Sequence, residues 1–307
     1  MADRTGQIGP DSILLYSTFR NERVRLPYFL DYYRNLGVNH FLMVDNGSDD
    51  GGREYLATQP DVSIWSTNHS YKRARFGVDW LNWLQFKYGH DHWCLVVDPD
   101  EFFVYPFCDT RPLRALTDWL DASSIKSFSA MLLDMYPKGP FDAQPYHEGQ
   151  DPFEIAQWFD SGNYTIQRNR KYGNLWIQGG PRARRFFAAE PRRAPTLNKV
   201  PLVRWNRRFA YVNSTHAILP PRLNRVYATD GGERISGALL HTKFLRGIVE
   251  KSAEEKHRRE HFANSTLYDS YYDSLVADPQ LWCDRSSRYT GWRGLEAMGL
   301  MSRGGWR

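Results

Sequence analysis

Short apolar runs alternate with amphipathic segments through the first 110 residues, and this alternation constrains the fold more than any other feature of the chain. The apolar runs are rich in strand-forming residues and comprise "SILLYSTF", "NHFLMV", "DVSIWST" and "HWCLVVDPDEFF". Between them lie "RNERVRLPYFLDYYRNLG", "GREYLATQ" and "ARFGVDWLNWLQFKYG", which favour helices. This order predicts an α/β protein with a Rossmann-like, mainly parallel sheet and helices on both of its faces.

Two of the helical segments carry an apolar stripe that is expected to face the sheet. In the first segment Gly37 fits a left-handed C-cap, and the stripe contains Leu26, Phe29, Leu30, Tyr33 and Leu36. In the segment "ARFGVDWLNWLQFKYG" the stripe contains Val78, Leu81, Trp83, Leu84 and Phe86.

The remainder of the chain is less regular. "FSAMLLDMYP" and "GALLHTKFL" predict two further strands, and the second leads into a helix over "RGIVEKSAEEKHRREHFA". Residues 176–213 predict short strands and loops with many arginines. Ligands of parallel α/β sheets bind where the strands end, so the loops after Phe19, Val44, Thr67 and Val97 are expected to share one ligand-binding rim.

Length and composition indicate a folded protein with a sizeable core, since the chain has 307 residues, 41% of them hydrophobic and 24% charged. Three cysteines without a CxxC pair favour a reducing compartment. The first residues lack the apolar core of a secretory signal, and no apolar run approaches ~18 residues. We therefore expect a cytoplasmic protein, with peripheral contact at the inner face of the membrane as a further prediction.

The acids at the end of "CLVVDPDEFF" are the strongest candidates for chemistry. Asp98 and Asp100 repel each other unless a cation or a proton intervenes. Carboxylates with an open coordination sphere suit Mg²⁺ or Mn²⁺, which can also bridge a diphosphate. Glu101 is expected to support the loop, and to point to the other face of the strand if the strand alternation persists.

Two further strand ends carry polar residues. His241 and Lys243 lie at the end of "LLHTKF", where an imidazole can complete the coordination of a metal and an ammonium can neutralise phosphate. Asp45 and Asn46 follow another apolar run and can read ribose hydroxyls or a base edge, or else form an ordinary turn. The sequence has no glycine-rich phosphate loop of the GxGxxG or Walker type.

Together these segments resemble a family. "STFRNERVRLPYFLDYYRNLGVNHFLMVDNGSDDGG" resembles the beginning of GT-A fold glycosyltransferases related to family 2, and "VVDPDEFF" resembles their DxD motif. "KVPLVRW", "STH" and "LLHTKF" are similar to segments of the bacterial cytoplasmic branch. The resemblance extends over roughly residues 11–250.

The resemblance implies a hexosyltransferase-like enzyme of polysaccharide biosynthesis that uses Mn²⁺ or Mg²⁺. It would transfer a sugar from a nucleotide-sugar donor to a glycan or lipid-linked acceptor, with inversion at the anomeric carbon, and no nucleic acid partner is expected. The metal ligands it implies are Asp98, Asp100 and His241. The residues it implies for binding the nucleotide are Thr18, Arg20, Asn21, Glu22, Asp45, Asn46, Arg75, Asp98 and Lys243.

A general base for the acceptor hydroxyl is not fixed by the sequence. Asp134, Glu190 and His216 compete for this role. Asp134 ranks first, narrowly, because it follows an apolar strand.

The resemblance also divides the chain. Residues 11–110 would form the Rossmann-like half that binds the nucleotide sugar. Residues 111–250 would form the acceptor-binding and metal-completing half of the same GT-A domain, and residues 251–307 a helical and aromatic C-terminal extension.

The basic second half motivates an alternative function. The formal net charge is +5, and arginine and lysine concentrate after residue 165. These charges form either an ordinary solvated surface or a face for an anionic partner. In the alternative hypothesis the chain is a non-catalytic module that binds an anionic glycan, a lipid head group or nucleic acid.

Overall fold

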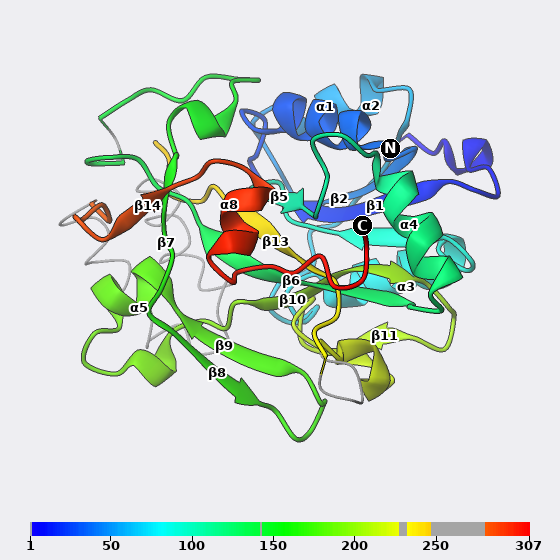
Figure 1. Ribbon diagram of the computed structural model, residues 1–307. Helices are drawn as coiled ribbons and strands as arrows, with labels where there is room; N and C mark the ends of the chain where they lie inside the picture. Colours follow the sequence, from blue (N-terminus) through cyan, green and yellow to red (C-terminus); the bar gives the residue numbers. More distant parts are fainter. Residues whose placement is uncertain (1, 142, 227–231, 247–279) are drawn as a thin grey trace.

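One eight-stranded sheet forms the centre of the molecule (Figure 1). The computed structural model describes residues 2–141, 143–226, 232–246 and 280–307. The strands of the sheet follow the spatial order β3–β2–β1–β4–β10–β6–β13–β5. Their bounds are β1 (Ile13–Phe19), β2 (His40–Asp45), β3 (Val62–Ser66), β4 (Trp93–Val96), β5 (Glu101–Val104), β6 (Ser127–Asp134), β10 (Asn198–Arg204) and β13 (Ser236–His241).

The directions of the strands determine which residues meet at each edge of the sheet. β3, β2, β1 and β4 are parallel, and β6 and β13 are parallel to each other. β10 is antiparallel to both β4 and β6, and β5 is antiparallel to β13. The carboxyl ends of β1, β2, β4, β6 and β13 therefore lie at one rim, where β10 and β5 begin. The prediction of a mainly parallel α/β sheet is confirmed.

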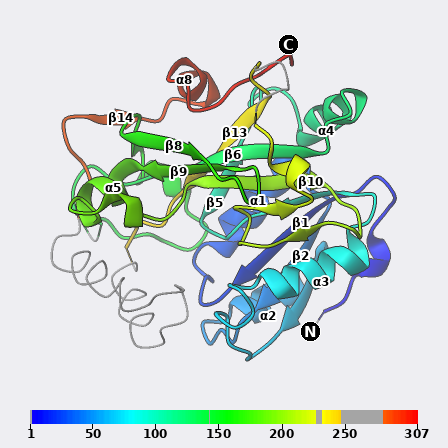
Figure 2. The same ribbon diagram turned by 90° about the horizontal axis from the view of Figure 1, so that it is seen from below.

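Helices cover both faces of the sheet, because its strands are apolar on both sides (Figures 1 and 2). Ile13 and Leu15 of β1 belong to the core shared with α1 (Leu26–Leu36), α2 (Gly52–Thr58) and α4 (Leu113–Ala122). Leu14 and Tyr16 belong to the core shared with α3 (Val78–Tyr88). Gly37 ends α1 with a φ of 101°, as its predicted C-cap role requires.

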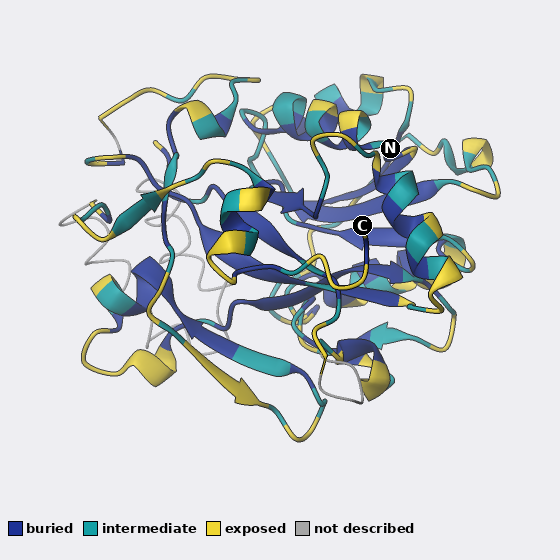
Figure 3. Ribbon diagram, viewed as in Figure 1, coloured by how far each residue is buried: buried dark blue, intermediate teal, exposed yellow. Residues whose placement is uncertain are grey.

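The predicted stripe of α3 is wrong at two positions. The central strands are largely buried, and exposed residues lie on the helices and loops around them (Figure 3). Trp83 and Phe86 of α3 are 53% and 55% exposed, whereas the buried positions of the helix are Val78, Leu81, Leu84 and Gln85. At about 100° per residue, positions 83 and 86 lie on the side of the helix opposite to the buried residues. A helix this rich in aromatic residues does not reveal its buried face by apolar content alone.

The predicted strand over "HWCLVVDPDEFF" is divided in two, because residues 97–100 turn away between β4 and β5. Three strands separate β4 from β5 in the sheet. The five steps from Val96 to Glu101 reach at most about 18 Å, whereas four strand spacings in a flat sheet amount to about 19 Å. The Glu101 backbone N–H also donates to the Asp98 carbonyl oxygen at 2.9 Å, so the segment is folded and spans much less than this reach. The sheet must therefore curl, and the curl brings β5 and β13 back towards the Asp98 turn.

The smaller elements lie around this sheet. The predicted helix after Leu245 lies outside the described residues, as do residues 251–279 of the predicted extension. Within the described residues, no helix is long and apolar enough to cross a membrane. The smaller elements are η1 (Thr5–Gln7), η2 (Pro152–Glu154), β7 (Trp158–Asp160), β8 (Tyr164–Arg168), β9 (Leu175–Gly179), α5 (Gly180–Phe186), η3 (Pro191–Arg193), β11 (Ala210–Tyr211), β12 (Ile218–Leu219), η4 (Pro221–Asn224), β14 (Ser286–Arg288) and α8 (Trp292–Ala297).

Candidate active site

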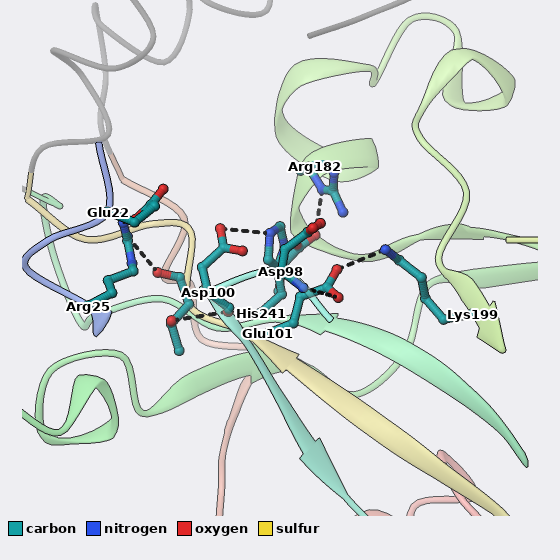
Figure 4. Close-up of polar contacts among 10 residues, drawn as sticks. Glu22, Arg25, Asp98, Asp100, Glu101, Arg182, Lys199 and His241 are labelled. Carbon is teal, nitrogen blue, oxygen red and sulfur yellow. Dashed lines mark hydrogen bonds and ion pairs between the residues drawn. The ribbon is translucent and has the colours of Figure 1, made fainter. Parts of the chain in front are cut away.

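Strand ends bring six polar residues together at the rim (Figure 4). β6 ends at Asp134 and β13 ends at His241, and the parallel register sets these two residues side by side. The antiparallel register sets His241 opposite Glu101, the first residue of β5. The cluster is completed by Asp98 and Asp100 in the turn after β4 and by Lys199 at the start of β10.

His241 lies between two carboxylates. Its Nδ1 is 2.7 Å from Asp134 Oδ1, and its Nε2 is 3.2 Å from Asp100 Oδ2. Burial alone would lower the pKa of His241, but the charge of Asp100 and the hydrogen bonds to both carboxylates raise it to about 9. The imidazole is therefore protonated at neutral pH in this arrangement and donates to both carboxylates.

Asp134 is buried and engaged on both oxygens. Besides its contact with His241, its Oδ2 accepts a hydrogen bond from Arg182 Nε at 2.7 Å. Burial would raise the pKa of Asp134, but the charges of Arg182 and His241 and their hydrogen bonds lower it below its ordinary value. Because its side chain has no exposed surface, the carboxylate orients its neighbours rather than facing solvent.

Asp100 is held from the backbone side as well. Its carbonyl oxygen accepts hydrogen bonds from the Thr242 backbone N–H at 2.8 Å and from the Thr242 hydroxyl at 3.2 Å. Burial opposes ionisation, but His241, Arg25 and Lys243 together hold the pKa of Asp100 well below its usual range. Arg25 is itself held by an ion pair with Glu22 at 2.9 Å. Asp100 therefore faces three cationic side chains.

Lys199 and Glu101 form a buried ion pair on the other side of the turn. Lys199 Nζ lies 2.9 Å from Glu101 Oε1, and Glu101 Oε2 accepts a hydrogen bond from the Asp98 backbone N–H at 3.2 Å. The prediction that Glu101 supports the loop is confirmed. The alternation that would have placed Glu101 on the other face does not continue, because the strand breaks before Glu101, and Glu101 lines the same pocket as Asp98.

Asp98 differs from Asp100 in its electrostatics. Burial and the charge of Glu101 raise the pKa of Asp98 to about 7, although Lys199 opposes the shift. Its environment favours the neutral acid, so a cation close to Asp98 would be needed to hold it fully ionised at neutral pH.

A small pocket of about 20 Å³ adjoins these acids and opens to solvent. Asp98, Glu101 and Lys199 line its polar side. The remaining lining residues are Thr18, Phe76, Val78, Leu81, Val96, Val97, Tyr211, Ser214 and Thr215. The pocket therefore joins a charged wall to an apolar wall that is edged by hydroxyl groups.

Four of the nine residues expected to bind nucleotide hold the rim loops together: Arg20, Asn21, Asp45 and Asn46. Arg20 Nη1 donates to the carbonyl oxygens of Asn46 and Gly47. Asn46 Nδ2 donates to the carbonyl oxygens of Thr67 and His69, each at 3.0 Å. Neither side chain lines the pocket described above.

Three other residues of this group have local partners. Asn21 Oδ1 accepts from the Asp49 backbone N–H, and buried Asp45 accepts from the Ser48 backbone N–H. Arg75 is exposed and pairs with Asp79 on α3. Of the expected nucleotide-binding residues, Thr18 and Asp98 line the pocket, and the charge of Lys243 acts on Asp100.

The general-base candidates are in three different environments. Glu190 is exposed and pairs with Arg193 at 2.7 Å. His216 Nδ1 lies 2.6 Å from the carbonyl oxygen of Asn198, and burial, followed by the charge of Lys199, lowers the pKa of His216 to about 3. Asp134 is the candidate that belongs to the rim cluster, but it contacts His241 and Arg182 there.

The donor set can be tested against a divalent cation. Two ligands at about 2.1 Å from one ion and at right angles to each other lie about 3 Å apart, so the 3.2 Å between Asp100 and His241 fits adjacent ligands. Asp134 occupies Nδ1 of His241 with a hydrogen bond, so Nε2 is the ring nitrogen that would face a cation. In the described part of the chain, no group of three or more His, Cys, Asp or Glu is arranged as a metal site. Asp100 and His241 therefore fit as ligands, whereas Asp98 is not positioned as a third.

Sequence comparison matches neither a known protein family nor a curated protein. Among solved structures, the chain is similar to a Bacillus anthracis protein described as a glucose-1-phosphate thymidylyltransferase, with 9% identity, a TM-score of 0.33 and coverage of 92% of this chain and 87% of that one. Mannosyl-3-phosphoglycerate synthase from Rubrobacter xylanophilus gives 16% identity and a TM-score of 0.28, over 46% and 49% of the two chains. HddC from Yersinia pseudotuberculosis gives 10% identity and a TM-score of 0.31, over 80% and 99%. These TM-scores lie below 0.5, so the similarity is too loose to carry an inference about activity.

Three residues of the site were not expected from the sequence: Arg25, Arg182 and Lys199. Arg182 lies in an arginine-rich segment, "PRARRFF", in which no single arginine stands out. Lys199 precedes the apolar run "VPLV", and a lysine at the start of a buried strand was the one available signal.

Proposed function

We propose that this chain is a glycosyltransferase that transfers a sugar from a nucleotide-sugar donor to a glycan or lipid-linked acceptor, with a divalent cation and inversion at the anomeric carbon. One observation carries the proposal: Asp100 and His241 meet at the rim of an α/β sheet, beside a pocket lined by Asp98 and Lys199. A polar cluster at the carboxyl ends of the strands is the usual ligand site of such sheets. The sequence resemblance to family 2 supports the same function.

Asp100 and His241 would hold Mn²⁺ or Mg²⁺, with Asp98 next to them. The cation, when bound, supplies positive charge to the diphosphate of the donor. His241 would bind it as neutral imidazole, since the cation replaces the proton on Nε2. Asp134, held by Arg182, would accept a hydrogen bond from Nδ1–H and so fix the ring. We therefore propose Asp134 as a positioning residue rather than as the general base.

The nucleotide portion of the donor would lie at this pocket, which would have to widen around it because its volume is about 20 Å³. Its apolar wall suits a base, and the hydroxyl groups of Thr18, Ser214 and Thr215 suit ribose. As the glycosidic bond breaks, negative charge develops on the leaving nucleoside diphosphate. Lys199, which lines the pocket, and Lys243, whose charge acts on Asp100, would stabilise this negative charge. A cytoplasmic site at the inner face of the membrane would suit a lipid-linked acceptor.

The first experiment is binding. Nucleoside diphosphates that contain uracil, guanine or cytosine are titrated with and without Mn²⁺ while thermal unfolding is followed. A ligand at about 100 times its Kd that binds only the native state raises the free energy of unfolding by about 2.7 kcal/mol. One diphosphate is expected to stabilise the protein, and to do so more strongly with Mn²⁺.

Variants connect this binding to the site. Asp100→Asn should remove the Mn²⁺-dependent part of the stabilisation and nearly abolish sugar transfer. Asp118→Asn, an exposed change on α4 with the same loss of charge, should leave both unchanged. The proposal fails if no diphosphate stabilises the protein or if Asp100→Asn transfers sugar at the wild-type rate.

A further inference from the structure

The exposed side of α3 carries an aromatic and cationic surface that the proposed reaction does not use. Trp83 and Phe86 are more than half exposed on neighbouring turns, although aromatic residues of this size are usually covered. Lys87, Arg207 and Arg208 are also exposed. We name these five residues the α3 surface.

The cations of the α3 surface lie against its rings. Lys87 Nζ is 5.1 Å from the ring centre of Trp83, and the Arg207 guanidinium is 6.0 Å from that of Phe86. Arg207 Nε also donates to the Phe86 carbonyl oxygen at 3.4 Å. The surface thus has apolar rings at its centre with charged ends of long side chains beside them.

Two hydrogen bonds fix the loop that supplies the arginines. Asn82 of α3 donates to the Tyr211 carbonyl oxygen and accepts from the Tyr211 backbone N–H, each at 2.9 Å. These bonds hold β11 against α3. Arg207 and Arg208 lie on the same loop shortly before β11, so the five side chains belong to one supported surface.

We propose that the α3 surface docks on a membrane whose lipids carry anionic head groups. Tryptophan and phenylalanine insert at the depth of the head groups, and lysine and arginine remain at the phosphates, where each cation adds to the attraction. The acid on the same face of the helix, Asp79, is already paired with Arg75 and opposes this attraction little.

A second copy of the chain fits the α3 surface less well. A two-fold interface would bring the same patch of both copies face to face. Lys87, Arg207 and Arg208 would then approach the same three cations of the other copy, and like charges brought together in an interface are unfavourable. The anionic bilayer is the occupant that matches both the rings and the charge.

Vesicle flotation tests the proposal with the full chain. Phosphatidylcholine vesicles are compared with vesicles that also contain phosphatidylglycerol, at low and at high salt. The protein should float with the anionic vesicles at low salt, and the bound fraction should fall with salt or without the anionic lipid. This result does not depend on the proposed sugar transfer, since neither metal nor nucleotide is present.

Two sets of variants locate the contact. Trp83→Ala with Phe86→Ala, and separately Lys87→Glu with Arg207→Glu and Arg208→Glu, should each weaken partition by at least about tenfold. The matched controls are Ile166→Ala with Met298→Ala, which are other exposed apolar residues, and Arg168→Glu with Arg170→Glu and Lys171→Glu. The controls should bind like wild type, and circular dichroism checks that every variant is folded.

Three outcomes would overturn the proposal. The first is no flotation of the wild-type chain with anionic vesicles. The second is loss of binding in the Arg168 control while the α3 variants still bind. The third is a dimer, seen by light scattering, that Trp83→Ala with Phe86→Ala converts to monomer while vesicle binding is unchanged.

Discussion

His241 Nδ1 and Asp134 Oδ1 lie 2.7 Å apart at the ends of two parallel strands whose register sets them side by side. The contact turns the other ring nitrogen, Nε2, towards Asp100. A backbone feature, the pairing of β6 with β13, therefore determines which atom of the imidazole is presented to the candidate metal site.

Asp134→Asn tests this relationship. The amide keeps the size of the side chain but removes the charge that holds Nδ1–H, so we expect Mn²⁺ affinity to fall by about 10- to 100-fold. Isothermal titration with Mn²⁺ measures this, and Asp118→Asn is the matched surface control. If Asp134 were instead the general base, the Asp134→Asn variant would bind Mn²⁺ like wild type and lose turnover alone.

Because Lys199 and Glu101 form a buried ion pair, removal of the Lys199 charge alone should destabilise the protein strongly. Lys199→Met should lower the free energy of unfolding by about 3–5 kcal/mol, because it leaves the Glu101 carboxylate buried without its cation. Glu101→Gln together with Lys199→Met should recover part of this loss, since no uncompensated charge remains. Urea denaturation measures both, and a double variant that is no more stable than Lys199→Met would contradict the argument.

The sequence predicted the sheet and the rim because both follow from local patterns. Apolar runs mark strands, and parallel strands place Asp98, Asp134 and His241 at one edge whatever their distance along the chain. The turn at Asp98 was missed because "CLVVDPDEFF" keeps strand-forming residues on both sides of it. The direction of Glu101 depends on that turn and was missed with it.

The partners of the site residues could not be predicted in the same way. Lys199 reaches Glu101 only because β10 enters the sheet between β4 and β6 in the antiparallel direction. Arg182 reaches Asp134 from α5, and nothing in "PRARRFF" distinguishes it from its neighbours. These contacts depend on tertiary packing, which local propensity does not encode.

The close packing of Gly77, just before α3, against Thr18 of β1 predicts that a larger residue at position 77 lowers stability. A Cβ at this position would lie 2.9 Å from Thr18 Cγ2, and its φ of 75° is unfavourable for other residues. Gly77→Ala should therefore cost more stability than Gly37→Ala, which has a φ of 101° but open space around its Cβ position. We expect a loss of about 2–3 kcal/mol against about 1 kcal/mol.

The same experiment has an internal check. Thr18→Ser removes the methyl group that the added Cβ would meet, so it should reduce the penalty of Gly77→Ala but not that of Gly37→Ala. Equal penalties for both glycine variants, measured by thermal or urea unfolding, would show that only the backbone conformation matters at position 77.

The lowered pKa of His216 predicts that the free energy of unfolding depends on pH between about 3 and 6.5. Burial and the charge of Lys199 lower its pKa from 6.5 to about 3 in the folded chain. Between these values the unfolded chain binds a proton that the native chain does not, so the free energy of unfolding falls as the pH falls. The contribution of His216 is complete above pH 6.5 and is lost as the pH drops towards about 3, with a slope of at most about 1.4 kcal/mol per pH unit.

His216→Asn should flatten this part of the stability curve. Asparagine can still donate to the Asn198 carbonyl oxygen but does not titrate, so the variant should lose less stability than wild type between pH 6.5 and 3. Exposed His147→Asn is the control and should follow the wild-type curve. Urea unfolding at a series of pH values gives the comparison, and parallel curves for wild type and His216→Asn would mean that the native chain protonates His216 as readily as the unfolded chain does.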